Sequence, residues 1–239
     1  MQEIINFFSQ FWLQCIIAAV IAYLISSVNT SIIVTRIVMH KDIRTMGSGN
    51  AGFTNVLRSV GKVPAIITFV GDFLKGVISV SGAYLLMMGV TGDKADLYRS
   101  YLAFFAGLFC VVGHSFPIYY KFKGGKGVVT TASVMLMTDW RILVLELAIF
   151  FICFVLTKTI SKCSITNAVC YPLMVLGLKL LDYYHICDVI SPLKKPTVPY
   201  IVFTTAVGLV TGVLIIIRHK DNIKRILNGT EKKITDKKK

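Results

Sequence analysis

Residues 198–217 read VPYIVFTTAVGLVTGVLIII, twenty residues without a charged side chain, and Arg218, His219 and Lys220 follow directly. A helix of about 20 apolar residues is long enough to cross the hydrocarbon core of a bilayer. Backbone polar groups in that core must be hydrogen-bonded within the protein, and a helix satisfies them within the segment itself. The stretch therefore predicts a transmembrane helix with a basic end, and with it an all-α membrane protein.

Similar apolar stretches recur along the chain. Of its 239 residues 55% are hydrophobic, and the mean hydropathy of +0.70 is higher than a soluble domain with a polar surface can carry. The fourth stretch has only 11 residues, so it either crosses fully or forms with the fifth a hairpin that enters the membrane part way. We predict a polytopic bundle of about seven transmembrane helices, at residues 11–39, 63–90, 101–120, 128–138, 142–157, 165–184 and 198–217.

The distribution of basic residues predicts the orientation of these helices. With seven crossings and the N-terminus outside, 19 of the 26 lysines and arginines fall on the inner side and six on the outer side. Cytoplasmic loops are enriched in these residues, so we expect a cytoplasmic C-terminus. Residues 1–10 have no basic start and no cleavage pattern, which indicates a retained first helix. We expect one integral-membrane domain over residues 1–230 and a basic cytoplasmic tail over 231–239.

Three polar segments interrupt the apolar pattern, and on this topology all three reach the cytoplasmic side. The first, residues 42–58, reads DIRTMGSGNAGFTNVLR. Its glycines allow positive φ and could turn backbone N–H groups toward an anion, beside four short polar side chains. A flexible loop with a helix cap at Asn50 or Thr54 would explain the same residues.

The second segment, residues 113–131, reads GHSFPIYYKFKGGKGVVTT. A Gly-Gly-Lys-Gly run that opens an apolar helix is typical of a phosphate-binding nest, since free N–H groups and the positive end of the helix face the ligand. The spacing excludes a Walker A loop. A positive-inside loop that stops a helix would need the lysines but not the three glycines.

The third segment, residues 218–231, reads RHKDNIKRILNGTE. In one continuous helix, Arg218, Asn222 and Arg225 would lie along one face. A basic amphipathic helix bound to anionic headgroups explains much of this pattern but leaves His219 and Asn222 unexplained.

A few polar residues fall inside the predicted spans, where burial in lipid is costly. Asp72 and Lys75 are three residues apart and are expected to neutralise each other on one helix face. Glu146 has no evident partner. The six cysteines form no CxxC pair, so we predict no disulfide framework and no metal site.

Together the three segments resemble the bacterial membrane glycerol-3-phosphate acyltransferases that use acyl phosphate, the PlsY family. Order, spacing and length agree over nearly the whole chain. One departure is Ser26-Ser27-Val28-Asn29, where the family usually has Gly-Ser-Ile-Pro, so a proline kink is absent or differently placed. The resemblance is carried by residues 47–50, 52, 54, 55, 58, 113, 114, 116, 117, 122–127, 218, 219, 222, 223, 225 and 229–231, with 72, 75 and 76 matching a further family stretch.

The resemblance implies acyl transfer from acyl phosphate to the primary hydroxyl of glycerol 3-phosphate, giving lysophosphatidic acid and phosphate, the first step of phospholipid synthesis. It implies no cofactor and no nucleic acid, and it places the site on the cytoplasmic face of the bacterial cytoplasmic membrane. The implied partners are the two substrates, membrane lipids and the enzyme that makes acyl phosphate. The residues alone leave two alternatives, a transporter of organic phosphates, whose cations would lie near mid-membrane, and a noncatalytic scaffold on anionic lipid.

We expect four catalytic residues, Ser48, Lys126, His219 and Asn222. Lys123 and Lys126 with the backbone of residues 124–127 are expected to hold acyl phosphate. A substrate phosphate is expected to accept the hydroxyl proton, with His114 or His219 as alternative bases. The expected substrate-binding residues are Arg44, Gly49, Asn50, Thr54, Asn55, Arg58, His114, Lys123, Gly124, Gly125, Gly127, Arg218 and Arg225.

Overall fold

The computed structural model describes residues 1–186, 189–193 and 195–233, and within them the chain is helical without strands. The described residues form two compact units, unit 1 (residues 1–138) and unit 2 (from residue 139), which are treated separately below. The helices are α1 (Gln2–Gln10), α2 (Trp12–Ser27), α3 (Thr30–Met39), η1 (Ile43–Thr45), α4 (Phe53–Ser59), α5 (Lys62–Leu86), α6 (Ala95–Ser115), η2 (Ile118–Tyr120), α7 (Val128–Thr157), α8 (Ile160–Tyr183), α9 (Val198–Arg218) and α10 (Lys220–Leu227).

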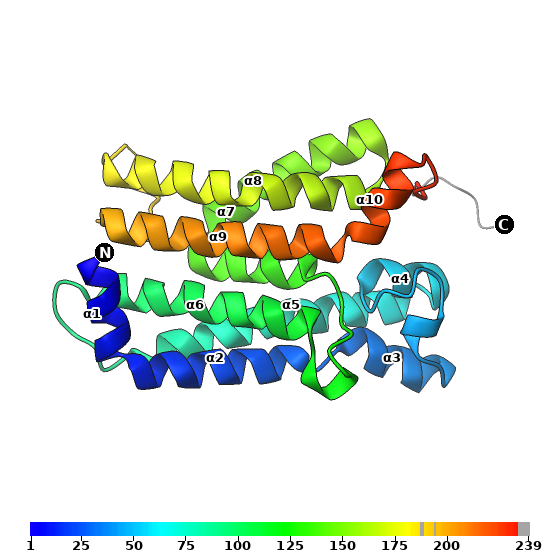
Figure 1. Cartoon of the computed structure of the whole chain (residues 1–239), viewed down its shortest axis with the longest axis horizontal. Helices are drawn as coiled ribbons and strands as arrows, with labels where there is room; N and C mark the ends of the chain where they lie inside the picture. The colour runs from blue at the N-terminus through cyan, green and yellow to red at the C-terminus, as the bar shows by residue number, and fades with distance from the viewer. Residues whose placement is uncertain (187–188, 194, 234–239) are drawn as a thin grey trace. The chain divides into compact units, whose positions relative to one another are not determined.

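Unit 1 is built around α2, α5 and α6, which pack against one another, and Figure 1 shows α2 running along α6. The short helix α1 was not predicted as a separate element. It lies against α6, where the ring of Phe7 stacks on that of Tyr101 at 4.9 Å between centroids. Tyr101 also donates a hydrogen bond of 2.9 Å to Glu3. These contacts hold the N-terminal helix on the bundle.

The predicted first span is two helices, because α2 and α3 are separated at Val28 and Asn29. Val28 is extended, with φ −67° and ψ 100°. Asn29 caps α3, and its Oδ1 accepts hydrogen bonds from Ile32 N at 3.1 Å and Ser31 Oγ at 2.6 Å. An asparagine cap thus makes the break that a proline usually makes in the family.

The predicted fourth and fifth spans are the two halves of α7. Asp139 leaves the helical conformation, with φ −161° and ψ 99°, between the predicted boundaries at residues 138 and 142. By length and hydropathy, six segments of the described residues could each cross a membrane, with α2 and α3 counted together and α7 counted once. The count of seven stays a prediction.

Unit 2 contains a buried cluster of four charges, formed by Asp139, Arg141, Lys179 and Asp182. Arg141 donates to both carboxylate oxygens of Asp182 at 2.8 and 2.7 Å, and Lys179 Nζ lies 2.6 Å from Asp139 Oδ2. The sequence count put Arg141 and Lys179 among the six basic residues of the outer side, and the structure buries both within helices. Two acids and two bases in mutual contact make this burial tolerable.

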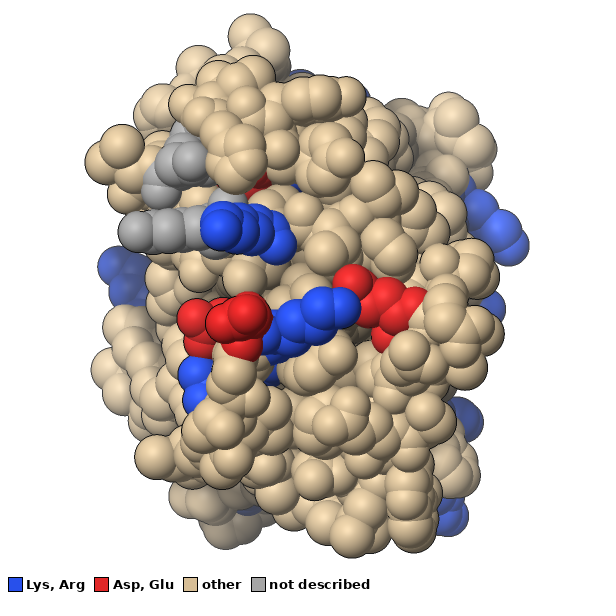
Figure 2. All heavy atoms as spheres, turned by 90° about the vertical axis from the view of Figure 1, so that its left-hand side faces the viewer, with Lys and Arg blue, Asp and Glu red and all other residues tan. Residues whose placement is uncertain are grey.

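The end of unit 1 where α6 begins carries paired charges. Lys94 Nζ lies 3.8 Å from a Glu3 carboxylate oxygen, and Arg99 donates to Asp96 at 2.8 Å. Figure 2 looks onto the end of the molecule where α1 lies and shows acidic and basic side chains on the same face. With 21 residues, α6 is about 32 Å long, so this balanced end is far from Ser115, where α6 ends.

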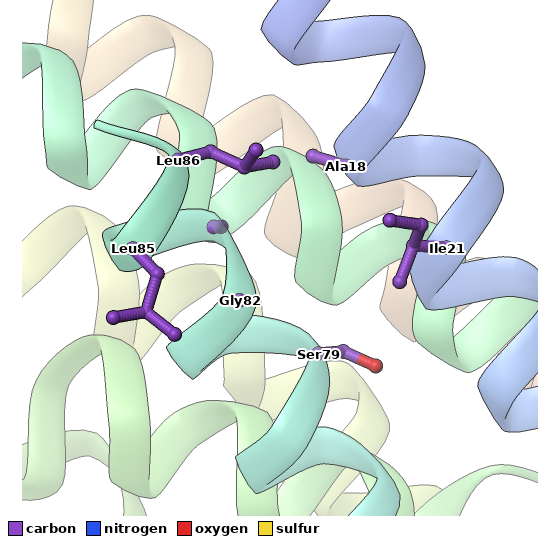
Figure 3. A pocket seen from close by; sticks show the side chains of 7 residues that line it. Ala18, Ile21, Ser79, Gly82, Leu85 and Leu86 are labelled. Atoms are coloured by element: carbon purple, nitrogen blue, oxygen red, sulfur yellow. The ribbon is translucent and has the colours of Figure 1, made fainter. Parts of the chain in front are cut away.

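An apolar groove of about 280 Å³ separates parts of α2 and α5. Figure 3 shows its labelled side chains, which come from these two helices. Ser79 contributes the one hydroxyl among the described lining residues, which are otherwise Ala18, Ile21, Gly82, Ala83, Leu85 and Leu86. None of these described lining residues is charged, and a single hydroxyl is not sufficient to bind a phosphate group.

Candidate active site

The first loop, residues 40–52, is organised by Asn55 of α4. Gly47 and Gly49 have φ of 56° and 72°, so the glycines do adopt the positive values that the sequence predicts. Asn55 is buried, its Oδ1 accepts from Ser48 N at 3.0 Å, and its Nδ2 donates to the Met46 carbonyl at 2.9 Å. The Asn55 amide therefore shapes the loop, while its contact with a substrate stays a prediction.

Asp42 holds Arg44, and this acid was not among the predicted site residues. Nε and Nη2 of Arg44 donate to the two carboxylate oxygens of Asp42, at 3.0 and 2.8 Å. The hydrogen bond from Arg44 lowers the pKa of Asp42 to about 2. The sequence does show an acid, Asp42, two residues before Arg44, and this spacing could have indicated an ion pair. It was missed because phosphate-binding sites are sought among basic residues.

Arg44 also joins the first loop to the glycine-rich loop, residues 121–127. Its Nη1 donates to the carbonyl of Tyr120 at 2.9 Å and approaches that of Lys123 at 3.4 Å. Its guanidinium lies 5.9 Å from the centre of the Tyr120 ring. Two of the three predicted polar segments are therefore in direct contact.

The glycine-rich loop is bonded to the end of α6. Gly124 N donates to the Ser115 carbonyl at 3.3 Å, and Gly125 N donates to the His114 carbonyl at 3.1 Å. These two N–H groups were predicted to face an anion, and that part of the nest prediction is wrong. The reason is that the last carbonyls of a helix have no partner within it, and the loop supplies one. As predicted, α7 opens directly after Gly127.

Gly125 lies where three segments meet. A Cβ at this position would overlap His114 Nε2 and would lie 2.6 Å from the carbonyl oxygen of Ala51 in the first loop. His114 is buried, Lys126 is half-buried and Lys123 is exposed. Gly125 thus joins the loop that carries the two lysines to the buried histidine of α6 and to the first loop of the same unit.

In unit 2, His219 separates two helices, so the third segment is not the one continuous helix that would align Arg218, Asn222 and Arg225 on one face. Arg218 is the last residue of α9, and α10 begins after His219, whose φ and ψ are −98° and 9°. His219 Nδ1 lies 2.8 Å from the Ile215 carbonyl. A carbonyl only accepts, so the proton is on Nδ1 and the neutral ring carries its lone pair on Nε2.

Glu231 binds two of the predicted site residues. Its carboxylate accepts from Asn222 Nδ2 at 2.7 Å and from Arg225 Nε at 2.6 Å, and the Ser161 hydroxyl bonds to it as well. Burial raises the pKa of Glu231, but the hydrogen bonds from Ser161, Arg225 and Asn222 outweigh it and lower the pKa overall. Glu231 is the first residue of the predicted basic tail, and these bonds tie it to α10, while residues 234–239 lie outside the described part.

Ser161, which bonds to Glu231, was not predicted as a site residue, because a single serine near the start of a helix gives no indication of such a contact.

The other predicted residues differ in their exposure to solvent. In the first loop Ser48 and Gly49 are exposed and Asn50 is half-buried. Partly exposed residues in or at the ends of helices are Thr54 and Arg58 of α4 and Arg218 of α9.

Comparisons with known proteins agree with these motifs. A family model described as glycerol-3-phosphate acyltransferase matches residues 16–229. The chain is 39% identical to a glycerol-3-phosphate acyltransferase of Clostridioides difficile, over 93% of this chain and 97% of that protein. A protein of the same description from Enterococcus faecalis is 34% identical, over 93% of each chain.

Solved structures show the same likeness. The chain resembles crystal structures of PlsY (YgiH), an integral membrane glycerol 3-phosphate acyltransferase, with 28% identity. The glycerol 3-phosphate form has a TM-score of 0.72 and is covered over 92% of this chain and 95% of its own, and the lysophosphatidic acid form has a TM-score of 0.67. The chain therefore belongs to the glycerol-3-phosphate acyltransferase family and is an all-helical, multi-pass membrane enzyme.

Proposed function

We propose that this enzyme takes its acyl group from acyl phosphate and transfers it to the primary hydroxyl of glycerol 3-phosphate, giving lysophosphatidic acid and phosphate as the first step of phospholipid synthesis. Support comes from the three motifs and from relatives solved in glycerol 3-phosphate and lysophosphatidic acid forms. The comparisons give no support to the alternative of an organic-phosphate transporter.

The observation that carries the proposal is the contact between the first loop and the glycine-rich loop. Arg44 bonds to the Tyr120 carbonyl, and Gly125 lies close to the Ala51 carbonyl, so Ser48, Lys123 and Lys126 lie on two loops that are in contact. A reaction that brings two phosphate groups and a developing oxyanion together needs several cations and hydrogen-bond donors that are positioned in advance.

The chemistry needs no covalent enzyme intermediate. The substrate hydroxyl oxygen forms a bond to the acyl carbon, the carbonyl oxygen becomes an oxyanion, and the bond between that carbon and the phosphate oxygen then breaks. Acyl phosphate is a mixed anhydride, so phosphate leaves readily. The hydroxyl proton passes to a substrate phosphate, and Lys123 and Lys126 balance the charge. His219 is the alternative base, since its Nε2 carries the lone pair.

The remaining roles follow the predicted division. Ser48, Lys126, His219 and Asn222 act on the reacting groups. Arg44, Asn55, Gly124 and Gly125 hold the two loops in place, and the other predicted residues bind the phosphates. Glu231 holds Asn222 and Arg225 in place by its hydrogen bonds. We propose that residues 1–230 work as one acyltransferase domain without a cofactor or a metal ion.

We also propose the orientation and the location. Seven crossings with the N-terminus outside bring the three polar segments to the cytoplasmic face of the bacterial cytoplasmic membrane, and the 19 to 6 distribution of basic residues supports this. The enzyme that makes acyl phosphate would deliver it to this face.

The test is a comparison of donors. Purified protein is incubated with labelled glycerol 3-phosphate and either palmitoyl phosphate or palmitoyl-CoA, and lysophosphatidic acid is measured. We expect product with palmitoyl phosphate alone. Product formation with the thioester alone would overturn the donor assignment and leave the family assignment in place.

A further inference from the structure

Asp72 and Lys75 form an ion pair inside α5, as the sequence predicts. Lys75 Nζ lies 2.7 Å from Asp72 Oδ1, and the two side chains are 6% and 2% exposed. The desolvation of such a pair offsets much of its attraction, so a buried pair contributes little net stability. Because net stability does not explain this buried pair in unit 1, its role depends on which other groups it contacts.

The same carboxylate oxygen faces a third group. His114 Nδ1 on α6 lies 3.7 Å from Asp72 Oδ1, so that oxygen stands next to both the Lys75 ammonium and the His114 ring. The ring is 4% exposed. Its other nitrogen, Nε2, is the atom that a Cβ on Gly125 would overlap. A chain of contacts thus runs from Asp72 through His114 to the glycine-rich loop.

The backbone follows the same route. The His114 carbonyl accepts the Gly125 N–H at 3.1 Å, so ring and backbone of one residue both meet Gly125. Thr130 Oγ1, one turn into α7, donates to the Asp72 carbonyl at 3.3 Å. The start of α7 is therefore bonded to the Asp72 turn of α5, and the loop before it is bonded to the end of α6.

We propose that Asp72, held in place by its ion pair with Lys75, is a positioning residue that orients His114 and through it the glycine-rich loop. This deepens the proposed function and rests on it, since the loop carries the two lysines that would bind acyl phosphate. At 3.7 Å the carboxylate is too far from Nδ1 for a direct hydrogen bond, so it acts on the ring through its charge, which favours the proton on that nitrogen. The position of the ring in turn limits how closely Gly125 approaches α6.

Hydrogen–deuterium exchange tests this without reference to activity. The Asp72→Asn variant should exchange faster than the native protein in peptides covering residues 121–127, because the N–H groups of Gly124 and Gly125 lose their fixed acceptors. The matched control is Asp96→Asn, which removes the acid of another ion pair in unit 1, at the opposite end of α6 and with its side chain 78% exposed. Equal exchange of residues 121–127 in all three proteins would overturn the proposal, as would acceleration spread evenly over α5 and α6.

A second variant covers the case in which Asp72→Asn fails to insert. Asp72→Asn with Lys75→Met leaves no unpaired buried charge and still lacks the carboxylate that faces His114. We expect this double variant to show the same local acceleration. Native exchange in the loop of this protein would refute the positioning role.

Kinetics then test whether Asp72 acts through His114. With whichever donor supports turnover, Asp72→Asn should raise KM for the donor on the order of tenfold, as expected when a residue that orients a ligand group is lost. Combined with His114→Gln, it should cost no more than His114→Gln alone. Losses that multiply in the double variant would show that Asp72 acts by another route. Because the exchange experiment uses no substrate, a wrong donor assignment does not affect it.

Discussion

Gly125→Ala tests the junction of the first loop with the glycine-rich loop. Ordinary van der Waals contact to a Cβ begins at 3.4 Å, whereas the added methyl would lie 2.6 Å from the Ala51 carbonyl oxygen and would overlap the His114 ring. Backbone and a buried ring are both hard to displace, so the loop itself has to shift, by about 0.8 Å or more. A misplacement on the order of 1 Å can cost about a hundredfold in rate.

We therefore expect kcat/KM to fall about a hundredfold in Gly125→Ala, measured with labelled glycerol 3-phosphate and palmitoyl phosphate. Gly82→Ala is the matched control, since a Cβ there meets open space in the groove of Figure 3 and activity should stay native. Size-exclusion chromatography in detergent shows whether both variants remain folded. Native kcat/KM in Gly125→Ala would refute the argument that this junction positions the site.

The remaining predictions concern charged groups. Glu231→Gln should raise KM for glycerol 3-phosphate, because the amide has no negative charge and keeps one acceptor oxygen, so its NH2 group faces either Asn222 or Arg225. The pKa of Glu231 is lower in the folded protein than in the unfolded chain, where it is about 4.3. The carboxylate therefore stabilises the fold above that value, and this stabilisation is lost as the pH falls through the folded pKa. The Tm values of native protein and Glu231→Gln should become equal only in acid, and a Tm difference that stays constant in acid would contradict this. Asp182→Asn should destabilise unit 2 by about 3–5 kcal/mol in thermal unfolding, because two buried cations then face one acid, and Asp182→Asn with Lys179→Met should recover part of the loss. Lys126→Met should lower kcat by about a hundred- to thousandfold. If a substrate phosphate is the base, His219→Gln should lower kcat by less. Loss of turnover in His219→Gln with normal affinity for both substrates would show that His219 is the base.

Helices were the part of the fold that the sequence predicted best. The boundaries of α5, α8 and α9 lie within a few residues of the predicted spans, because hydrocarbon thickness fixes the length of an apolar run. The breaks were harder to predict. The one at Asn29 depends on a side-chain cap, and the one at Asp139 depends on partners in α8 that are 40 residues away in the chain.

The candidate site shows the same division. The sequence predicted that glycines at 47 and 49 would adopt positive φ, since this follows from the residue type. It did not predict that the amides of Gly124 and Gly125 bond to α6, because that depends on where the end of another helix lies. It also failed to identify Asp42 and Glu231 as site residues. An acid repels phosphate, so it is a candidate only once the structure shows that it is paired with an arginine, as Asp42 is with Arg44 and Glu231 with Arg225.

These acids distinguish two arginines that look alike in the sequence. A guanidinium has five N–H donors in a fixed plane. Arg225 gives one of them, on Nε, to Glu231, whereas Arg44 uses Nε, Nη1 and Nη2 on Asp42, Tyr120 and Lys123.

Arg225 therefore keeps more donors for a phosphate, and we expect it to contact a substrate while Arg44 holds the loops together. A lysine cannot reproduce the planar set of donors. Arg225→Lys should raise KM for glycerol 3-phosphate with little change in Tm, and Arg44→Lys should lower Tm. Melting curves and KM values of the two variants, measured under the same conditions, decide between the roles. The reverse pattern, with a Tm loss for Arg225→Lys and a KM effect alone for Arg44→Lys, would show that donor occupancy does not determine which arginine binds substrate.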